Sequence, residues 1–408
     1  MTRRMFVEQT AGAAAVPLLA AASGAFAQEA GAKAASSVQV ERKLRIGIVG
    51  LGSRGSWIAG LFKQHPGYEI VAAVDYFEET ANAVGDKLGV PAGKRFSGLA
   101  GYKRALDSGV EALVLEGIPY FYPEQAAAAI DAGCHVYTAK PFAVDVPAVF
   151  KMQALAKKAT EKKLCFRVDY QLPTDPANQE VKQRIAEGGL GGLAHIYSGG
   201  TCGKLPDPPV GPTIENLFKR AWYSHIGMSG DLMLLYDIHI IDGITWVTGK
   251  RAVGASGYAR IVRPDPHGDR TDCGGVVFQL ADGTCWTHTT QLLQNNTFMY
   301  NLEADLMGRE ATAHLAYNGK VCVRGGPKHY VGEVSKGIYT DGAKANIAEF
   351  HRCVTEGKFD NETAHRSVDS TLTGILGREA MLRKTWLTMD EVIKEAKTRE
   401  VNLRGLKV

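Results

Sequence analysis

The first part of the chain alternates short apolar runs with segments of helical spacing. The apolar runs lie at residues 44–50, 68–75, 111–117, 135–140 and 164–171, and helical segments lie at 52–65, after 80, at 122–133 and at 146–159. Alternation of this kind predicts a parallel sheet with helices on both faces and right-handed crossovers. We therefore expect an α/β domain over residues 43–170.

After about residue 190 the pattern changes to longer strands joined in hairpins. The stretch 278–292 turns at Asp282-Gly283 and the stretch 314–323 turns at Asn318-Gly319, both typical hairpin dipeptides. One long helix is predicted over about 229–248, and two more close the chain at 345–357 and 365–384. Residues 171–408 are thus expected to form an α+β domain with a large, mainly antiparallel open sheet.

The first 27 residues read as a targeting segment. Arg3 and Arg4 precede an apolar stretch at about 11–22, and Ala25-Phe26-Ala27 has the form of a cleavage site. The pattern matches a twin-arginine export signal, and the apolar stretch is too short to span a bilayer stably. We predict a signal peptide at 1–27, a flexible arm at 28–42 and a periplasmic protein; a disordered basic tail is the alternative.

Composition and charge exclude some functions. The 408 residues are 45% hydrophobic and 22% charged with a net charge of +4, and no run of Lys and Arg is interleaved with aromatic residues, so nothing indicates nucleic acid as a partner. The seven cysteines are scattered without CxxC or metal-ligand spacing, so no metal site is predicted. Their odd number leaves at least one unpaired within the chain.

A glycine-rich turn joins the first apolar run to the first helical segment. It reads Gly50-x-Gly52-x-x-Gly55, as in dinucleotide-binding Rossmann domains. In such turns the first glycine permits a tight turn, the second lets backbone amides approach a pyrophosphate, and the third allows close packing of the helix. The start of the helix favours the negative charge of the phosphates. A glycine-rich turn without a ligand is the alternative.

Asp75 supports the dinucleotide reading because it ends the next strand, 20 residues beyond Gly55. Its carboxylate can accept hydrogen bonds from ribose hydroxyls and would repel a 2′-phosphate, which favours NAD over NADP. Tyr76 and Phe77 can flank the adenine. The cofactor-binding residues expected in this region are Gly50, Gly52, Ser53, Arg54, Gly55, Asp75 and Tyr76.

Taken together, "RIGIVGLGSRG", "AAAAIDAGCHVYTAKPFAVD" and "AWYSHIGMSGDLMLLYDIHIIDGITWVTG" resemble the Gfo/Idh/MocA family of sugar and inositol oxidoreductases. The resemblance covers nearly all of the chain after the signal. It implies a Rossmann domain followed by an α/β domain whose open sheet often joins subunits, so we expect a homo-oligomer. It also implies a catalytic lysine at Lys140, often followed by a cis bond to Pro141, and a catalytic histidine at His239.

Two positions depart from the family pattern. The usual Glu-Lys-Pro reads Ala139-Lys140-Pro141, and the aspartate usually found four residues before the histidine is Leu235. Asp237 lies two residues before His239, which on a continuous helix points it about 160° away. It can replace the missing group only if the helix is broken there. Tyr236, on the adjoining face, is a weaker candidate.

The candidate chemistry is oxidation of an alcohol. His239 is the expected base for the hydroxyl proton, and Lys140, at the carboxyl end of a parallel strand, is the expected stabiliser of the developing oxyanion. The alternatives are a solvated strand end for Lys140 and an ordinary helix-face histidine for His239. Further candidates are Pro119 and Gln171 for the cofactor, and Asp169, Tyr223, His225 and Tyr236 for the substrate.

These observations favour an NAD-dependent oxidoreductase acting on a sugar or glycoside hydroxyl. If the protein is exported, NAD loaded before export would have to be retained and recycled within each catalytic cycle. An NAD-dependent glycosidase that works by transient oxidation and elimination is a second possibility. A non-catalytic, NAD-containing sugar-binding protein is a third, suggested by the two departures.

Overall fold

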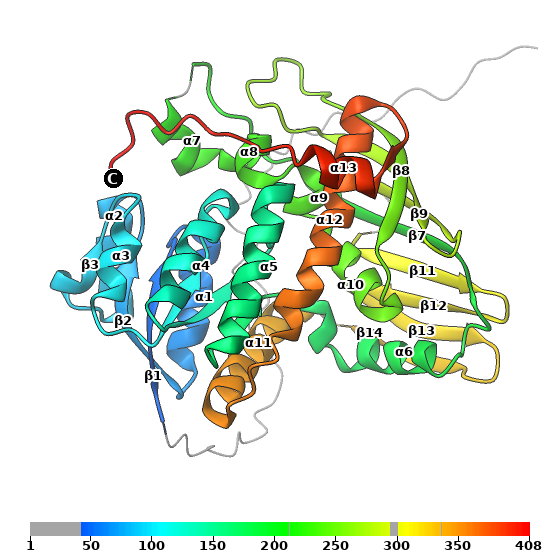
Figure 1. The fold of residues 1–408 in the computed structure, drawn as a ribbon, viewed down its shortest axis with the longest axis horizontal. Coiled ribbons are helices and arrows are strands. Elements are labelled where there is room, and N and C mark those ends of the chain that lie inside the picture. The colour runs from blue at the N-terminus through cyan, green and yellow to red at the C-terminus, as the bar shows by residue number, and fades with distance from the viewer. Residues whose placement is uncertain (1–41, 212, 294–300, 336) are drawn as a thin grey trace, which may run out of the picture. The chain divides into compact units, whose positions relative to one another are not determined.

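The computed structural model describes residues 42–211, 213–293, 301–335 and 337–408. The predicted signal peptide and residues 28–41 of the predicted arm lie outside the described residues. From Leu44 onward, the described residues form two β-sheets with helices packed on them (Figure 1).

The first sheet has six parallel strands in the order β3-β2-β1-β4-β5-β6. The strands are β1 (Leu44–Val49), β2 (Tyr68–Val74), β3 (Arg95–Phe96), β4 (Ala112–Leu115), β5 (His135–Thr138) and β6 (Phe166–Val168). The helices between them are α1 (Ser53–Gln64), α2 (Glu78–Leu88), α3 (Gly101–Leu106), α4 (Tyr122–Asp131) and α5 (Val146–Glu161). This order is that of a Rossmann domain and confirms the predicted parallel sheet. The last apolar run, predicted over 164–171, is a strand only in its middle.

The second sheet has nine strands in the order β14-β13-β12-β11-β7-β10-β9-β8-β15. Its strands are β7 (Leu193–Cys202), β8 (Ala252–Arg260), β9 (Cys273–Leu280), β10 (Cys285–Leu292), β11 (Glu303–Gly308), β12 (Ala311–Ala316), β13 (Gly319–Gly325), β14 (Tyr330–Ser335) and β15 (Leu387–Thr388). Among these described strands, only β7 and β10 pair in parallel. The mainly antiparallel sheet and both hairpin turns are as predicted.

Helices cover one face of this second sheet. The helices in this part of the chain are α6 (Pro176–Ala186), α7 (Ile214–Arg220), α8 (Ile226–Ser229), α9 (Leu232–Leu235), α10 (Ile238–Thr248), α11 (Ile338–Glu356), α12 (Glu362–Arg383) and α13 (Met389–Glu395). α12 contacts strands of both sheets and so ties them together. Tyr197, Tyr258 and Val277 of the sheet are exposed. The homo-oligomer expected through this sheet stays a prediction.

The prediction of one helix over about 229–248 is wrong. The chain instead forms α8, α9 and α10, and Tyr236 leaves the helical conformation with φ −124° and ψ −56°. The amide of His239 bonds to the carbonyl of Tyr236 rather than to that of Leu235, four residues back. A tertiary contact helps to fix the start of α9, because the carboxylate of Asp231 accepts bonds from the amide and hydroxyl of Thr271. Apolar spacing cannot reveal such a contact.

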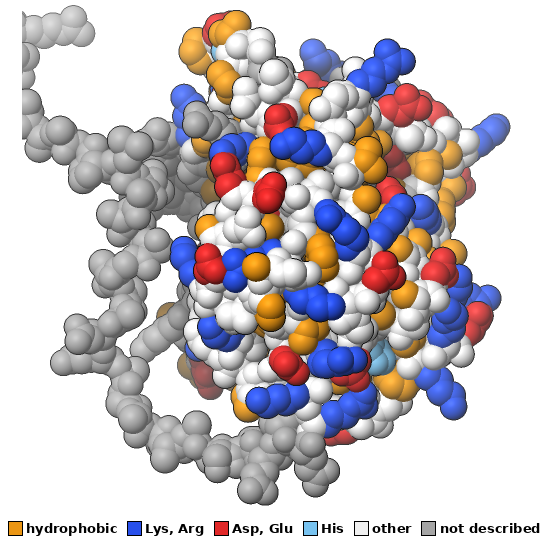
Figure 2. All heavy atoms as spheres, turned by 90° about the vertical axis from the view of Figure 1, so that its left-hand side faces the viewer, with side chains coloured by type: hydrophobic (Ala, Val, Ile, Leu, Met, Phe, Trp, Pro, Cys, Tyr) orange, Lys and Arg blue, Asp and Glu red, His pale blue; other side chains and the backbone are white. Residues whose placement is uncertain are grey.

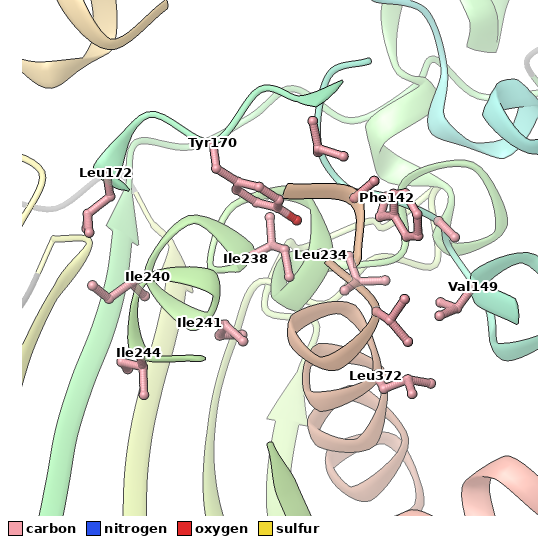
Figure 3. Close-up of a cluster of buried hydrophobic side chains, with 14 of the residues drawn as sticks. Phe142, Val149, Tyr170, Leu172, Leu234, Ile238, Ile240, Ile241, Ile244 and Leu372 are labelled. Carbon is pink, nitrogen blue, oxygen red and sulfur yellow. The ribbon is translucent and has the colours of Figure 1, made fainter. Parts of the chain in front are cut away.

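α10 is embedded in the core. Ile238, Ile240, Ile241 and Ile244 pack among apolar residues from α5, α9, α12 and the segment after β6 (Figure 3). A helix that is apolar on nearly all sides is held firmly by its surroundings. His239, on the same helix, is buried with it.

The surface that carries α2 and α3 shows Lys and Arg side chains interspersed with Asp and Glu (Figure 2). This mixture fits the small net charge. Among the helices of the described residues, none has the length and apolar character needed to cross a membrane.

Candidate active site

The glycine turn between β1 and α1 is shaped by close contacts. Gly50 has φ +87°, and a Cβ added there would lie 2.4 Å from the backbone of Gly117, which follows β4. A Cβ on Gly55 would lie 1.8 Å from the carbonyl oxygen of Gly50, so α1 packs directly on the turn. A Cβ on Gly52 would meet nothing within 4 Å. The turn therefore needs Gly50 and Gly55 for its own packing, whereas the space at Gly52 is open for a ligand.

A cavity of about 410 Å³ opens from this turn. Gly52 is the N-cap of α1 and provides no side-chain cap, so amides of the first turn of α1 are left for a phosphate. The Asp75 carboxylate accepts the amides of Leu51 and Phe77 at 2.8 and 3.0 Å, which oppose the increase in its pKa caused by burial. The open space, the amides and the carboxylate fit NAD. The lining includes Gly50, Gly52, Ser53, Arg54, Gly55, Asp75, Tyr76, Phe77, Glu116, Phe218, Trp222 and Tyr223.

Arg54 connects this cavity to buried carboxylates. Its guanidinium lies 2.6 Å from Asp169 and 3.4 Å from Glu116, and it also donates to the hydroxyl of Tyr339. Burial raises the pKa of Glu116 to about 8 although Arg54 acts in the opposite direction. Sequence reasoning missed Glu116. Its signal was a lone carboxylate at the carboxyl end of an otherwise apolar strand, where ligands of parallel sheets bind.

Lys140 follows β5 and donates to the carbonyl oxygen of Leu235 at 2.6 Å. That carbonyl is free because α9 ends there and the amide of His239 bonds elsewhere. Burial, reinforced by the charge of Arg54, lowers the pKa of Lys140 to about 7. The Lys140–Pro141 bond is cis, as the resemblance implied.

His239 is only 5% exposed, and its Nδ1 lies 2.8 Å from the hydroxyl of Tyr317. Burial, then the charges of Lys140 and Arg54, hold the pKa of His239 well below its usual value. The imidazole is therefore neutral near pH 7. The two predicted catalytic residues thus lie close enough for the charge of one to act on the other.

Asp237 reaches the same region because the helix is broken before it. Its carboxylate is fully buried, and Oδ2 lies 3.5 Å from Nε2 of His288 on β10. A Cβ on Gly200 of β7 would lie 1.7 Å from Oδ1, so the glycine makes room for this carboxylate. Burial raises the pKa of Asp237, while His288 and Lys140 lower it. On a continuous helix Asp237 would point away from His239, but this objection does not apply because the helix is broken.

The other candidates are distributed around these groups. Asp169 and Gln171 are fully buried and bonded to each other, and they lie between Arg54 and Tyr317. Tyr223 lines the dinucleotide cavity, and the hydroxyl of Tyr236 bonds to Asn301 at 2.7 Å.

Two candidates make mainly local contacts. His225 accepts the amide of Gly227 and so caps α8. Pro119 opens a short 3₁₀ turn after β4 and does not line the cavity.

A second, larger cavity of about 670 Å³ lies beside α11 and α12. Charged side chains such as Arg167, Glu349 and Arg366 line it, but no residue predicted for the site does so. Size alone therefore does not identify the functional cavity.

Residues 44–169 match the Gfo/Idh/MocA model, described as an oxidoreductase family with an NAD-binding Rossmann fold. The chain is 23% identical over 277 residues to a scyllo-inositol 2-dehydrogenase (NAD(+)) of Bacillus subtilis strain 168, covering 67% of this chain and 74% of that protein. A structure of scyllo-inositol dehydrogenase from Lactobacillus casei with bound NAD(H) and scyllo-inositol superposes with TM-score 0.67 and 21% identity, over 86% of this chain and 100% of that one. The aldose-aldose oxidoreductase of Caulobacter crescentus, complexed with glycerol, gives TM-score 0.66 and 16% identity, over 85% and 100%.

These similarities confirm the Rossmann fold, NAD as the cofactor and an oxidoreductase as the class of enzyme. The two solved structures share the fold of this chain over both sheets.

The glycine turn allows a matched test. Gly52→Ala is expected to fold normally, because its φ of −64° and ψ of −167° suit any residue, and to bind NAD about ten-fold more weakly, or about 1.4 kcal/mol. Gly55→Ala should instead destabilise the fold by about 1–3 kcal/mol through the collision with Gly50. Calorimetric NAD titration and thermal melts measure both effects. An unchanged NAD affinity in folded Gly52→Ala would contradict this placement of the pyrophosphate.

Proposed function

We propose that this chain, whose residues 44–169 are the NAD-binding Rossmann domain of the Gfo/Idh/MocA oxidoreductases, oxidises a ring hydroxyl of a sugar, glycoside or cyclitol. One observation carries the proposal. Lys140, at the end of a Rossmann strand, bonds to the carbonyl at the helix break that precedes His239, and its charge acts on that imidazole. An ammonium and a neutral imidazole are the groups that alcohol oxidation requires, and both are within the electrostatic influence of Arg54, which lines the dinucleotide cavity.

Bound NAD supplies the hydride acceptor for this reaction. His239, held neutral, takes the proton of the substrate hydroxyl as the carbon is oxidised. Lys140 donates to the same oxygen and stabilises the negative charge that develops there. His239 is buried and Lys140 is partly buried, so the charge of the ammonium acts through a medium of lower polarity than water.

Asp237 supports the charged form of Lys140. Its carboxylate raises the pKa of the lysine, opposing burial and Arg54. His288 in turn raises the fraction of Asp237 that is ionised. We infer that this pair serves the lysine in place of the aspartate that the family pattern puts at position 235.

The relatives support a polyhydroxylated substrate. Their names refer to scyllo-inositol and to aldoses, which are ring compounds with several secondary hydroxyls or derive from them. An aldose-aldose oxidoreductase suits a cycle in which one sugar is oxidised and a second is reduced. We propose that such a cycle regenerates the cofactor here.

We further propose that the protein is exported and retains its NAD, on the basis of the Arg3-Arg4 pattern. Residues 401–408 support retention, since they run past α8 and α7 toward α2 (Figure 1). The carbonyl of Lys407 accepts the amide of Leu99 at 2.9 Å, and its amide donates to the hydroxyl of Tyr76 at 3.1 Å. Leu406 packs in a cluster with Phe218, whose neighbours Tyr76, Phe77, Leu99 and Trp222 line the cavity.

Product analysis tests the proposed reaction. Purified protein incubated with inositols, aldoses and aryl glycosides should yield a keto product, with reduction of the nucleotide or of a second sugar. Release of aryl alcohol without an acceptor would instead indicate the glycosidase. If no substrate is turned over and Lys140→Ala binds the same sugars as the unmodified protein, the chain is a binding protein.

The pH dependence tests the role of Lys140. Because the ammonium form is required and its pKa is about 7, kcat/KM should fall as pH rises through this value, by up to ten-fold per unit at higher pH. Lys140→Arg, which stays charged, should lose this decline. The profile should have no acidic limb near 6.5, since His239 is already neutral there. A rise of kcat/KM through pH 7 would show that Lys140 acts as a neutral base.

The segment 401–408 can be tested through cofactor retention. Leu406→Asp should put a charge into the apolar cluster and lower the amount of NAD that survives purification by about ten-fold, while added NAD restores kcat. Val408→Asp, at a side chain that is 88% exposed, is the matched control and should behave as wild type. Nucleotide content is measured by absorbance and mass. Full retention of NAD in Leu406→Asp would contradict the role of this segment.

A further inference from the structure

A chain of hydrogen bonds leads from Arg54 to His239. The guanidinium donates to Oδ2 of Asp169, and Nε2 of Gln171 donates to the same oxygen at 2.9 Å. Oε1 of Gln171 lies 3.3 Å from the hydroxyl of Tyr317, which is 2.8 Å from Nδ1 of His239. The four residues after Arg54 are at most 5% exposed, so their polar groups need hydrogen-bond partners within the protein.

The direction of each hydrogen bond in this series can be worked out from Asp169 towards His239. Asp169, paired with Arg54, can only accept, and its Oδ1 also accepts from Asn346. Gln171 must therefore turn its amide nitrogen to Asp169 and its carbonyl to Tyr317. A carbonyl only accepts, so the single hydroxyl proton of Tyr317 is directed to Gln171. The phenol oxygen is then left to accept from His239, which requires the proton of the imidazole to be on Nδ1.

The opposite direction leaves an unfavourable contact. If Tyr317 donated to Nδ1, its oxygen lone pairs would face the carbonyl oxygen of Gln171 at 3.3 Å without a proton between them. Rotating the amide of Gln171 would set its carbonyl against the carboxylate of Asp169 instead. In a buried site, an acceptor that lacks a donor destabilises the structure. The backbone amides of Leu172 and Gln171 also bond to the Tyr317 hydroxyl, and the arrangement in which Tyr317 donates to Gln171 is the one that leaves no pair of acceptors facing each other along these bonds.

We propose that Asp169, Gln171 and Tyr317 are positioning residues that hold His239 in the Nδ1–H tautomer, so that Nε2 is the proton acceptor. The inference rests on the proposed oxidation and specifies which atom of His239 acts in it. The substrate hydroxyl gives its proton to Nε2 and its carbon gives a hydride to bound NAD, leaving a carbonyl. The resulting imidazolium keeps its Nδ1–H bond to Tyr317.

The electrostatics of the site are consistent with this assignment. The pKa of His239 is held low by burial and nearby cations, so the ring carries one proton near neutral pH and its tautomer matters. Arg54, the first residue in this series of hydrogen bonds, also lines the dinucleotide cavity. The orientation of the base is thereby tied to the turn that binds the cofactor.

The test measures the tautomer directly, without turnover. In protein labelled with ¹⁵N-histidine, long-range ¹H–¹⁵N correlations distinguish Nδ1–H from Nε2–H, and the signals of His239 are identified by their loss in His239→Asn. The unmodified protein should show Nδ1–H. In Gln171→Met, which removes the acceptor, Tyr317 is free to donate to Nδ1, so the Nε2–H form should predominate. Tyr317→Phe should give a mixture of tautomers.

Kinetics provide the second readout. Tyr317→Phe and Gln171→Met should lower kcat by about 10²-fold with little change in KM. Tyr170→Phe is the matched control: this tyrosine is equally buried, lies near α10 (Figure 3) and should leave the tautomer and kcat unchanged.

Two results would overturn the proposal. They are an Nε2–H tautomer in the unmodified protein, or Tyr317→Phe with an unchanged tautomer and kcat. Failure to find any oxidisable substrate would count against the proposed function but would leave the tautomer result intact.

Discussion

The hydrogen bond from Lys140 to the carbonyl of Leu235 is the contact on which the rest of the site depends. It exists because the chain leaves the helix at Tyr236, so that the carbonyl loses its usual amide partner. The same break brings the carboxylate of Asp237 toward the second sheet and starts α10, whose apolar sides are locked in the core. In a continuous helix the amide of His239 would bond to the carbonyl of Leu235 and Asp237 would point away. Lys140 would then lose the carbonyl that it bonds to.

The charges gathered here are hard to explain by stability alone. Arg54 and Lys140 share a buried region with Glu116, Asp169 and Asp237, and burying such groups is costly unless each is paired. Some pairing is only partial, since Arg54 lies 3.4 Å from Glu116 and His288 lies 3.5 Å from Asp237. The pKa values of about 7 for Lys140 and about 8 for Glu116 place their titration near neutrality. Groups perturbed in this way beside a ligand cavity are typical of functional sites.

Local sequence rules were sufficient to predict the parallel sheet and the glycine turn of the first domain. The glycine spacing and Asp75 are read from short-range patterns, because a turn, a strand end and a helix start are set by nearby residues. The break at Tyr236 was not predicted, since it depends on contacts such as that between Asp231 and Thr271, 40 residues apart. Tyr317 was missed for the same reason: it follows β12 at a hairpin turn and reaches His239 only because the neighbouring strand β11 packs against α10. Glu116 and His288 lie in strand patterns that look purely structural until the sheets are assembled.

Whether Lys140 and His239 contact the same substrate hydroxyl is tested most directly by a crystal structure of the protein with NAD and a bound polyol. Nζ of Lys140 and Nε2 of His239 should both lie within about 3.2 Å of one hydroxyl oxygen of the ligand, with its carbon facing the nicotinamide. A ligand whose hydroxyl contacts neither group, or a Lys140 that stays on the carbonyl of Leu235 with the ligand elsewhere, would contradict the catalytic role of this pair.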